Sequence, residues 1–493
     1  MPTRTAPSRR LALLVLCTAS LMVILDGSVV AVALPAIQRD LGFSAAGLAW
    51  VVNAYLVAFG GLLLLAGRLG DLLGRRRVFL AGVALFTLAS LLCAVATTPG
   101  VLVSARFLQG AGGASATAVS LGMIVRLYPE PAGRTRAIAV FSFTGAAGAS
   151  IGMLAGGVLT GIAGWPAIFL VNVPIGLAVL LAALRGVAPD RGAGLRAGLD
   201  VPGAALATSG LMVTVLAIVG VGEHGWTSVR TAGAALLATV LLAAFVRRQQ
   251  VAATPLLPLR VLRTPDLVAA NVVQFLAVAA LFGFQFLLAL ALQLVLGLDA
   301  TAAGLAFLPT PVAIAVVSLG LAGRLAARYG ARPVLVTGLG LAVVGFLLLA
   351  RLPADGSYPV DVLPAVLVFG IAGGLILPAV TTLAMAGADP ADAGLASGLV
   401  NTTQQVGGAL GLAVLATLAA SRTDAVREAG RTATDALAAG YRAAFAVAAA
   451  LVAAALLVAL AALGRRRPVA IPAVAGTPAV AGTPAEPVRR TAA

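Results

Sequence analysis

One stretch decides the fold: Gly67-Arg68-Leu69-Gly70-Asp71-Leu72-Leu73-Gly74-Arg75-Arg76-Arg77-Val78, a charged and glycine-rich link between two long apolar runs. A related stretch follows 256 positions later, Gly323-Arg324-Leu325-Ala326-Ala327-Arg328-Tyr329-Gly330-Ala331-Arg332-Pro333-Val334, and six of the twelve aligned residues are identical. Such internal similarity indicates that one structural unit occurs more than once. The chain is therefore predicted to consist of two related halves.

The amino-acid composition indicates whether these halves face water or lipid. Of the 493 residues, 61% are apolar and only 10% are charged, and the mean hydropathy is +1.06. A soluble protein keeps about 25% charged residues, so most of this surface must face lipid. The net charge is +16, but the basic residues are all Arg and lie in short links between apolar runs. This distribution argues against a nucleic-acid partner, which would need a basic face.

The residue types offer little for catalysis or cofactor binding. Cys17 and Cys93 lie inside apolar runs, where cysteine usually acts as a small hydrophobic residue. The sequence has no disulfide framework, no metal-ligand spacing, no nucleophile–base pair and no Gly-x-x-x-x-Gly-Lys phosphate loop. We therefore expect no enzyme activity, no metal and no cofactor, with a proton gradient rather than ATP as the energy source.

Apolar segments long enough to cross a membrane occur fourteen times. A membrane-spanning helix needs about 20 mostly apolar residues. The predicted spans are 11–34, 47–67, 78–96, 101–122, 137–160, 166–184, 201–219, 230–246, 267–291, 303–323, 333–350, 362–386, 394–419 and 443–463. The predicted fold is thus an all-α integral membrane protein with fourteen transmembrane helices.

The repeated link assigns these spans to the halves. Its first copy joins spans 2 and 3, and its second copy joins spans 10 and 11. Two six-helix bundles, 11–184 and 266–463, should therefore flank a cytoplasmic link and an additional helix pair in 185–265. Residues 1–10 form a short N-terminus. The tail 464–493 repeats Pro-Ala-Val-Ala-Gly-Thr and is expected to be disordered, because it has too little bulk to pack.

The distribution of Arg predicts the orientation. With the N-terminus inside, 25 Arg fall on the cytoplasmic side, seven fall outside, and one lies within a span. Because positive residues favour the cytoplasmic side, both termini are expected there. Two links fit poorly. Link 386–393 should be inside but contains no Arg, and outer link 421–442 contains four. We expect the latter to form a short amphipathic segment outside.

The first apolar run has a second interpretation. It follows Arg9-Arg10 and contains Ala31-Val32-Ala33, which resembles a signal-peptide cleavage site. However, it is long enough to span a membrane and carries Asp26, and the predicted topology requires it. We therefore expect an uncleaved first span.

Four further motifs carry a family resemblance. They are Leu25-Asp26-Gly27-Ser28-Val29-Val30-Ala31-Val32-Ala33-Leu34-Pro35, Arg106-Phe107-Leu108-Gln109-Gly110-Ala111-Gly112-Gly113-Ala114, Trp165-Pro166-Ala167-Ile168-Phe169-Leu170-Val171-Asn172-Val173-Pro174-Ile175-Gly176 and Gly394-Leu395-Ala396-Ser397-Gly398-Leu399-Val400-Asn401-Thr402-Thr403-Gln404-Gln405-Val406-Gly407-Gly408. Together with the opening link, they resemble the major facilitator superfamily and, within it, the fourteen-span drug:proton antiporters of the EmrB/QacA type. The sequence departs from the antiporter motif Gly-Pro-x-x-Gly-Gly at Met153, which replaces the proline, and this departure leaves the direction of transport open.

Two charged residues lie within the predicted spans, Asp26 in span 1 and Arg106 in span 4. A rise of about 1.5 Å per residue puts Asp26 roughly 22 Å from the inner start of its span and Arg106 roughly 8 Å from the outer start of its own. Both are thus expected in the outer half. In the resembled fold spans 1 and 4 line the same central cavity, so the resemblance implies that the two residues form a water-linked pair. Intramembrane charges usually face a cavity and are functional, and the resemblance implies proton coupling. Alternatively, Asp26 packs a helix break near Gly27, and Arg106 extends to the outer interface.

Two glycine-containing segments suggest further functional features, a conformational latch and a close contact between helices. The resemblance implies a conformational latch in the opening link, formed by Gly67, Asp71, Gly74, Arg75 and Arg76. In this interpretation Asp71 begins span 3, where an acid suits a helix N-terminus; alternatively, the Arg residues only fix topology. Span 5 carries Gly148, Gly152 and Gly156 on one face, with Gly157 beside them, which allows close helix packing. The resemblance adds that this face is a sliding seam between the halves.

Polar residues within spans are weaker candidates, because each can equally bond to a neighbouring helix. The candidate substrate-binding residues are Asn53, Tyr55, Gln109, Asn271, Gln274, Gln285, Asn401, Gln404 and Gln405. The sequence as a whole predicts a monomeric, proton-coupled exporter of small apolar or cationic compounds in the cell membrane, working by alternating access. The alternatives are an importer or uniporter on the same fold, or a non-transport membrane enzyme or assembly subunit.

Overall fold

The computed structural model describes residues 9–45, 47–190, 192, 194, 200–225, 227–257, 265–386 and 393–463. The N-terminal half comprises α1 (Arg9–Leu41), α2 (Trp50–Leu73), α3 (Arg75–Ala94), α4 (Pro99–Leu127), α5 (Pro131–Ala163), α6 (Pro166–Leu170) and α7 (Asn172–Gly186). A central pair follows, α8 (Val201–His224) and α9 (Val229–Val251). The C-terminal half comprises α10 (Pro265–Leu294), α11 (Ala300–Phe307), α12 (Pro309–Val317), α13 (Gly323–Tyr329), α14 (Ala331–Leu349), α15 (Leu363–Ala386), α16 (Ala393–Glu428) and α17 (Ala433–Ala462).

These helices form fourteen membrane segments, which confirms the predicted fold class. Thirteen described segments are long and apolar enough to cross a membrane, and α5 supplies the fourteenth. Two segments are interrupted. The sixth consists of α6 and α7, and the tenth consists of α11, α12, a π-helical turn at Ser318–Ala322 and α13. The first segment is not interrupted, so the predicted break near Gly27 is wrong.

The opening link is almost entirely helical. Helix α2 continues to Leu73 and α3 begins at Arg75, so only Gly74 separates them, with a φ of 100°. The repeat has the same turn at Gly330, with a φ of 89°. Positive φ is readily adopted only by glycine, which explains why both copies keep it. Asp71 consequently lies in the last turn of α2, and its predicted position at the start of the next span is wrong.

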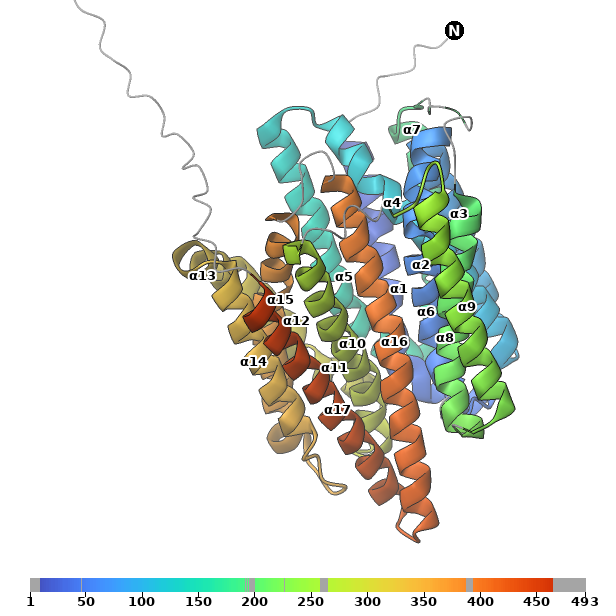
Figure 1. Cartoon of the computed structure of the whole chain (residues 1–493), viewed down its shortest axis with the longest axis vertical. Helices are drawn as coiled ribbons and strands as arrows, with labels where there is room; N and C mark the ends of the chain where they lie inside the picture. The colour runs from blue at the N-terminus through green and yellow to red at the C-terminus, as the bar shows by residue number, and fades with distance from the viewer. Residues whose placement is uncertain are drawn as a thin grey trace, which may run out of the picture.

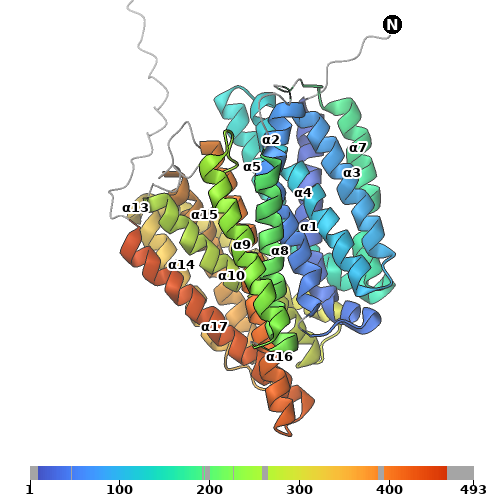
Figure 2. The same cartoon turned by 45° about the vertical axis from the view of Figure 1, so that its right-hand side comes forward.

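The two halves lie side by side as separate bundles (Figure 1). They meet where α1 contacts α10, where α5 contacts α11, and where α2 contacts α16. The central pair packs through α8 against both α2 and α16, so it covers the line along which these two helices meet (Figure 2). The outer face of α9 remains exposed, with Leu236 68% and Val240 54% accessible, as expected of a lipid-facing helix.

The last two helices project beyond the rest of the bundle at the bottom of Figure 1. Helix α16 runs to Glu428, and α17 starts at Ala433 with Thr432 as its N-cap. The predicted separate amphipathic segment in 421–442 is therefore wrong, because the charged residues there continue the two spanning helices. Alternating Arg and acidic residues are compatible with a solvated helix.

Candidate functional site

A buried ion pair lies inside the N-terminal half. The Nη1 atom of Arg106 on α4 is 2.5 Å from Oδ2 of Asp26 on α1, and the two side chains are 1% and 0% exposed. The contact is direct, so the predicted water-linked arrangement is wrong. The burial of Arg106 also contradicts the alternative in which this side chain extends to the interface. Buried charges are tolerated when they are paired and further hydrogen-bonded.

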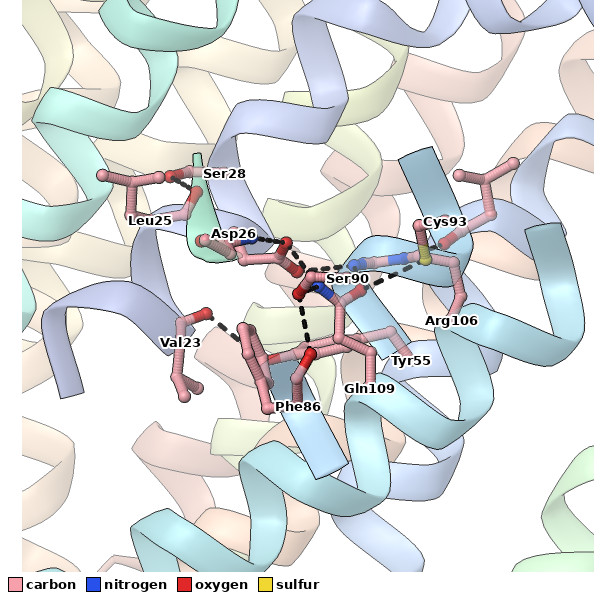
Figure 3. Close-up of polar contacts among 12 residues, drawn as sticks. Val23, Leu25, Asp26, Ser28, Tyr55, Phe86, Ser90, Cys93, Arg106 and Gln109 are labelled. Carbon is pink, nitrogen blue, oxygen red and sulfur yellow. Dashed lines mark hydrogen bonds and ion pairs between the residues drawn. The ribbon is translucent and has the colours of Figure 1, made fainter. Parts of the chain in front are cut away.

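Three polar side chains complete the cluster around this pair (Figure 3). Gln109 donates to Asp26 Oδ1 at 2.7 Å and to Ser90 Oγ at 2.8 Å, and it accepts from Arg106 at 2.6 Å. Asn172 donates to the same Asp26 oxygen at 2.8 Å. The carboxylate thus accepts from three side chains on two other elements, which distributes its charge within a region that water does not reach.

The guanidinium of Arg106 is enclosed on its other sides. Its Nε donates to the carbonyl of Val51 at 2.8 Å. Its central carbon lies 4.4 Å from the ring centre of Tyr55 and 5.8 Å from that of Phe169, distances typical of cation–π contacts. The hydroxyl of Tyr55 donates to Val23 O at 3.3 Å. Helices α1, α2, α4 and α6 therefore all hold the same charged cluster.

Local sequence explains how these groups converge. Arg106 and Gln109 are three residues apart on α4 and so share one face. Asn172 is the first residue of α7, directly after the interruption that separates it from α6. The sequence analysis did not assign Asn172 or Ser90 to the site. The interruption is the missed signal, because a break within a charge-free span brings a polar side chain inward at membrane depth.

The predicted substrate-binding residues separate into groups. Tyr55 and Gln109 belong to the charged cluster. Asn53 is fully buried, and neither atom of its amide has a hydrogen-bond partner in the described part of the chain. On α10, Asn271 and Gln274 are 8% and 4% exposed, and each has an unpartnered amide oxygen. The remaining candidates are partly or largely exposed: Gln285, Asn401, Gln404 and Gln405.

The predicted latch residues bond within their own half. Arg75 forms an ion pair with Asp71 at 3.0 Å and donates to the carbonyl of Gly122 on α4 at 2.8 Å. Arg76 donates to the carbonyl of Leu184 at 2.9 Å. In this structure the link is thus tied to α4 and α7, and its action as a conformational latch stays a prediction.

Asp190 is a partner of the link that the sequence analysis did not single out. Its carboxylate accepts from the backbone N–H groups of Arg75 at 2.7 Å and Arg76 at 3.0 Å. These are orphan donors at the start of α3, so Asp190 caps that helix from a segment more than a hundred residues away. Any side chain on Gly74 would meet the backbone carbonyl of Asp190. Gly67 is the remaining latch candidate. A Cβ added to it would meet, among the described residues, the Cβ of Ala118 at 4.0 Å.

The glycine face of α5 serves two different contacts. A Cβ on Gly148, Gly152 or Gly156 would meet α1, at Leu21, at Leu25 and Ser28, or at Val29 respectively. These three glycines therefore pack inside the N-terminal half and do not form a seam between halves. Gly157 does face the other half, because a Cβ there would meet the backbone of Ala300 and Thr301 on α11.

Within the described residues, no group of three or more His, Cys, Asp or Glu side chains is placed to hold a metal ion. A charged cluster sealed inside one half of a two-part helical bundle, with fourteen membrane segments, defines a multi-pass membrane transporter. The chain belongs to the Major Facilitator Superfamily, whose family model matches residues 16–412. The resemblance stated from the motifs is thereby confirmed. Members of this family carry small molecules across membranes and are not enzymes.

Curated relatives and solved structures agree with this assignment. The chain is 41% identical over 417 residues to the cephamycin export protein of Amycolatopsis lactamdurans, covering 84% of this chain and 85% of that protein. It is 40% identical over 428 residues to the puromycin resistance protein of Streptomyces alboniger, covering 85% and 83%. A bacterial homologue of the human lysosomal transporter Spinster, in an inward-facing conformation, superposes with a TM-score of 0.67 over 93% of this chain and 98% of that chain, at 17% identity.

Proposed function

We propose that the protein exports antibiotic-like small molecules from the cell in exchange for protons, by alternating access of a central site to the two sides of the membrane. The two relatives described above are named for the export of, or resistance to, small antibiotics, and each is matched over more than four fifths of its length. This similarity supports export as the direction of transport, which the missing span-5 proline left open.

The observation that carries the proton coupling is the buried pair of Asp26 and Arg106. The carboxylate of Asp26 has no exposure to solvent, and its hydrogen bonds come from Arg106, Gln109 and Asn172. If one proton binds to Asp26, the ion pair loses its attraction and Arg106 becomes an uncompensated buried cation. The helices that share the cluster must then rearrange. Proton binding and helix packing are coupled in this way.

We propose an orientation with both chain ends in the cytoplasm, on the strength of the Arg distribution. The end of the bundle opposite to the start of α1 is then the outer end. Two side-chain hydrogen bonds join the halves at that end: Gln293 donates to Val32 O at 2.9 Å, and Thr301 donates to Gly157 O at 3.4 Å. In this orientation the structure corresponds to a state closed toward the outside.

Inverted membrane vesicles test the proposal, since their interior corresponds to the outside of the cell. With an acidic interior, wild-type vesicles should accumulate labelled puromycin or cephamycin C, and a protonophore should abolish accumulation. Asp26→Asn should lose gradient-driven uptake at least tenfold, because it cannot exchange a proton, and uptake is compared per amount of folded protein because this change also removes the partner of Arg106. Asp355→Asn is the matched control, since Asp355 is exposed and lies outside the spans.

The vesicle measurements distinguish proton-coupled export from uniport and from import. Uptake in Asp26→Asn equal to that of the wild type would exclude Asp26 as the proton site. Equilibration of the compound without accumulation, unaffected by the protonophore, would indicate a uniporter. Accumulation only in right-side-out vesicles would indicate an importer.

A further inference from the structure

A pocket lies within the C-terminal half, away from the charged cluster. The empty space beside its lining is about 480 Å³, a volume that includes open space outside the walls. Four helices surround it: α10, α14, α15 and α17. Its lining includes Gln274 and Ala277 of α10, Ala342 and Phe346 of α14, and Phe369 and Ala372 of α15.

The walls of this pocket are almost entirely apolar. Phe346 and Phe369 form an aromatic corner, with ring centres 4.6 Å apart and planes at 75°. Such an edge-to-face pair presents a ring face and a ring edge to anything beside it, and both favour contact with a further aromatic ring. None of the residues that line the pocket is charged. A charged group would therefore lose its hydration here without gaining a partner.

Gln274 is the one polar residue of the lining. Its side chain is 4% exposed, and its amide oxygen Oε1 has no hydrogen-bond partner among the residues that the structure describes. A buried amide oxygen without a donor destabilises a fold, whereas a leucine of similar size would not. Asn271, one turn earlier, differs because its amide nitrogen donates to Leu267 O at 2.8 Å and so ties to its own helix. The described part of the C-terminal half thus supplies no donor for Gln274 Oε1.

We propose that this pocket is a binding site for an uncharged, apolar, preferably aromatic group that carries one hydrogen-bond donor, which Gln274 Oε1 accepts. The aromatic corner of Phe346 and Phe369 holds the ring. Naming this group as part of the exported molecule rests on the proposed function. This assignment places substrate recognition in the C-terminal half, whereas the ion pair of Asp26 lies in the N-terminal half. The exported molecule and the proton therefore bind to different bundles.

Photolabelling of the full chain in lipid nanodiscs tests the site without requiring transport. The probe is 4-hydroxybenzophenone, which is uncharged, has two aromatic rings and one O–H donor, and inserts into nearby C–H bonds on illumination. Mass spectrometry of the labelled peptides should find the adduct on pocket residues of α10, α14, α15 or α17. Labelling should saturate with probe concentration, which insertion from the lipid does not.

Two variants and a matched control decide the assignment. Gln274→Leu should raise the half-saturating probe concentration about tenfold, as expected for one lost hydrogen bond in a dry site, while the midpoint of thermal unfolding stays the same or rises. Ala342→Phe should abolish the adduct by filling the pocket. Val344→Phe should leave it unchanged, because Val344 is on the same helix but 48% exposed.

The outcomes are distinct from those of the vesicle experiment. Absence of label from the pocket residues, or saturable labelling that neither Gln274→Leu nor Ala342→Phe alters, would overturn the site even if wild-type vesicles accumulate puromycin. Loss of label in Ala342→Phe alone would overturn the role of Gln274. Saturable labelling with the expected losses would support the site even if no export were found, and the proposed function would then fail by itself.

Discussion

At the scale of single residues, Asp26 and Arg106 form a buried ion pair inside the N-terminal half. Neither charge reaches water, so each depends on the other and on the neutral amides around them. An ion pair in such surroundings contributes little net stability compared with apolar residues, but breaking it is costly because one charge is left without a partner. The pair is therefore better explained by a function that needs charge at this depth than by stability.

The variant Arg106→Ala tests this dependence. It should lower the free energy of unfolding by about 3–5 kcal/mol, because Asp26 would be left buried without its partner cation. Thermal unfolding in detergent measures the effect, and Arg324→Ala on the exposed side of α13 is the control. The double variant Asp26→Leu with Arg106→Met should recover most of the stability without transport. An unchanged unfolding midpoint for Arg106→Ala would contradict the buried geometry.

The sequence predicts the charged residues of this cluster better than the neutral ones. Asp26 and Arg106 stood out because charge within an apolar span is rare, and their depths already suggested that they meet. Asn172 carries no charge, and its position becomes informative only once α6 and α7 are seen to break beside it. Pro174 marks such a break in the sequence, because it has no N–H to donate to the carbonyl of Leu170, but the sequence does not show which side chain the break turns toward Asp26.

At the scale of elements, a polar cluster around Asp200 joins the two helices of the central pair, α8 and α9, at one end. Asp200 caps α8 by accepting from Gly203 N at 3.0 Å, and it accepts from Arg248 at 2.9 Å and Gln249 at 2.9 Å near the end of α9. Gln249 in turn accepts from Leu257 N at 3.0 Å. This arrangement joins the first residue before α8 to the last turn of α9, which holds the pair together as a helical hairpin.

The stability of this hairpin should depend on pH. Burial of the Asp200 carboxylate raises its pKa, but the hydrogen bonds from Arg248, Gln249 and Gly203 outweigh burial, so the net pKa is lowered. A carboxyl group whose pKa is lower in the folded chain stabilises the fold fully above its unfolded pKa of about 3.9 and loses that contribution as the pH falls through the lowered folded value. The hairpin should therefore loosen in acid and not in alkali.

Thermal unfolding between pH 6 and pH 3 measures this dependence. The wild-type midpoint should fall in the acid part of the range more steeply than that of Asp200→Asn, because asparagine keeps the cap on Gly203 but cannot titrate. At pH 6 the variant should be the less stable of the two, since it lacks the charge that faces Arg248. Parallel curves for both proteins would show that Asp200 does not carry the pH dependence.

The links between elements show a second limit of sequence reasoning. The repeat predicted a link between spans in both halves, and in the structure each link turns at a glycine with positive φ, Gly74 and Gly330. It did not show that the turn is a single residue, which puts Asp71 at the end of α2. Hydropathy marks where apolar residues stop, whereas helices continue through charged residues until the backbone turns. The extensions of α16 and α17 were misjudged for the same reason.

At the scale of the whole molecule, the halves are held together most visibly at the end distant from the start of α1. There Gln293 of α10 bonds to Val32 of α1, and Thr301 of α11 bonds to Gly157 of α5. The same glycine allows close backbone approach, since a side chain on it would meet Ala300 O. The proposed alternating access requires this end to separate. A contact that depends on the absence of a side chain at Gly157 lets the two helices approach closely without a bond that prevents their separation.

The variant Gly157→Ala tests whether this approach sets the balance between states. Its added methyl group would overlap the backbone of α11, and such overpacking costs about 1–3 kcal/mol. Because only the closed state brings these helices together, the population should shift toward separation at this end by a factor of about 5–150.

Spin labels at Ile162 on α5 and Leu294 on α10, both exposed near this end, measure the separation by pulsed electron resonance. Gly157→Ala should increase the fraction of long distances relative to the wild type. Gly340→Ala is the control, because no atom lies within 4 Å of a Cβ built there. Gly152→Ala should lower overall stability without changing the distances, since that glycine packs against α1 of its own half. If Gly157→Ala leaves the distance distribution unchanged, the close approach of α5 and α11 does not govern which side is closed.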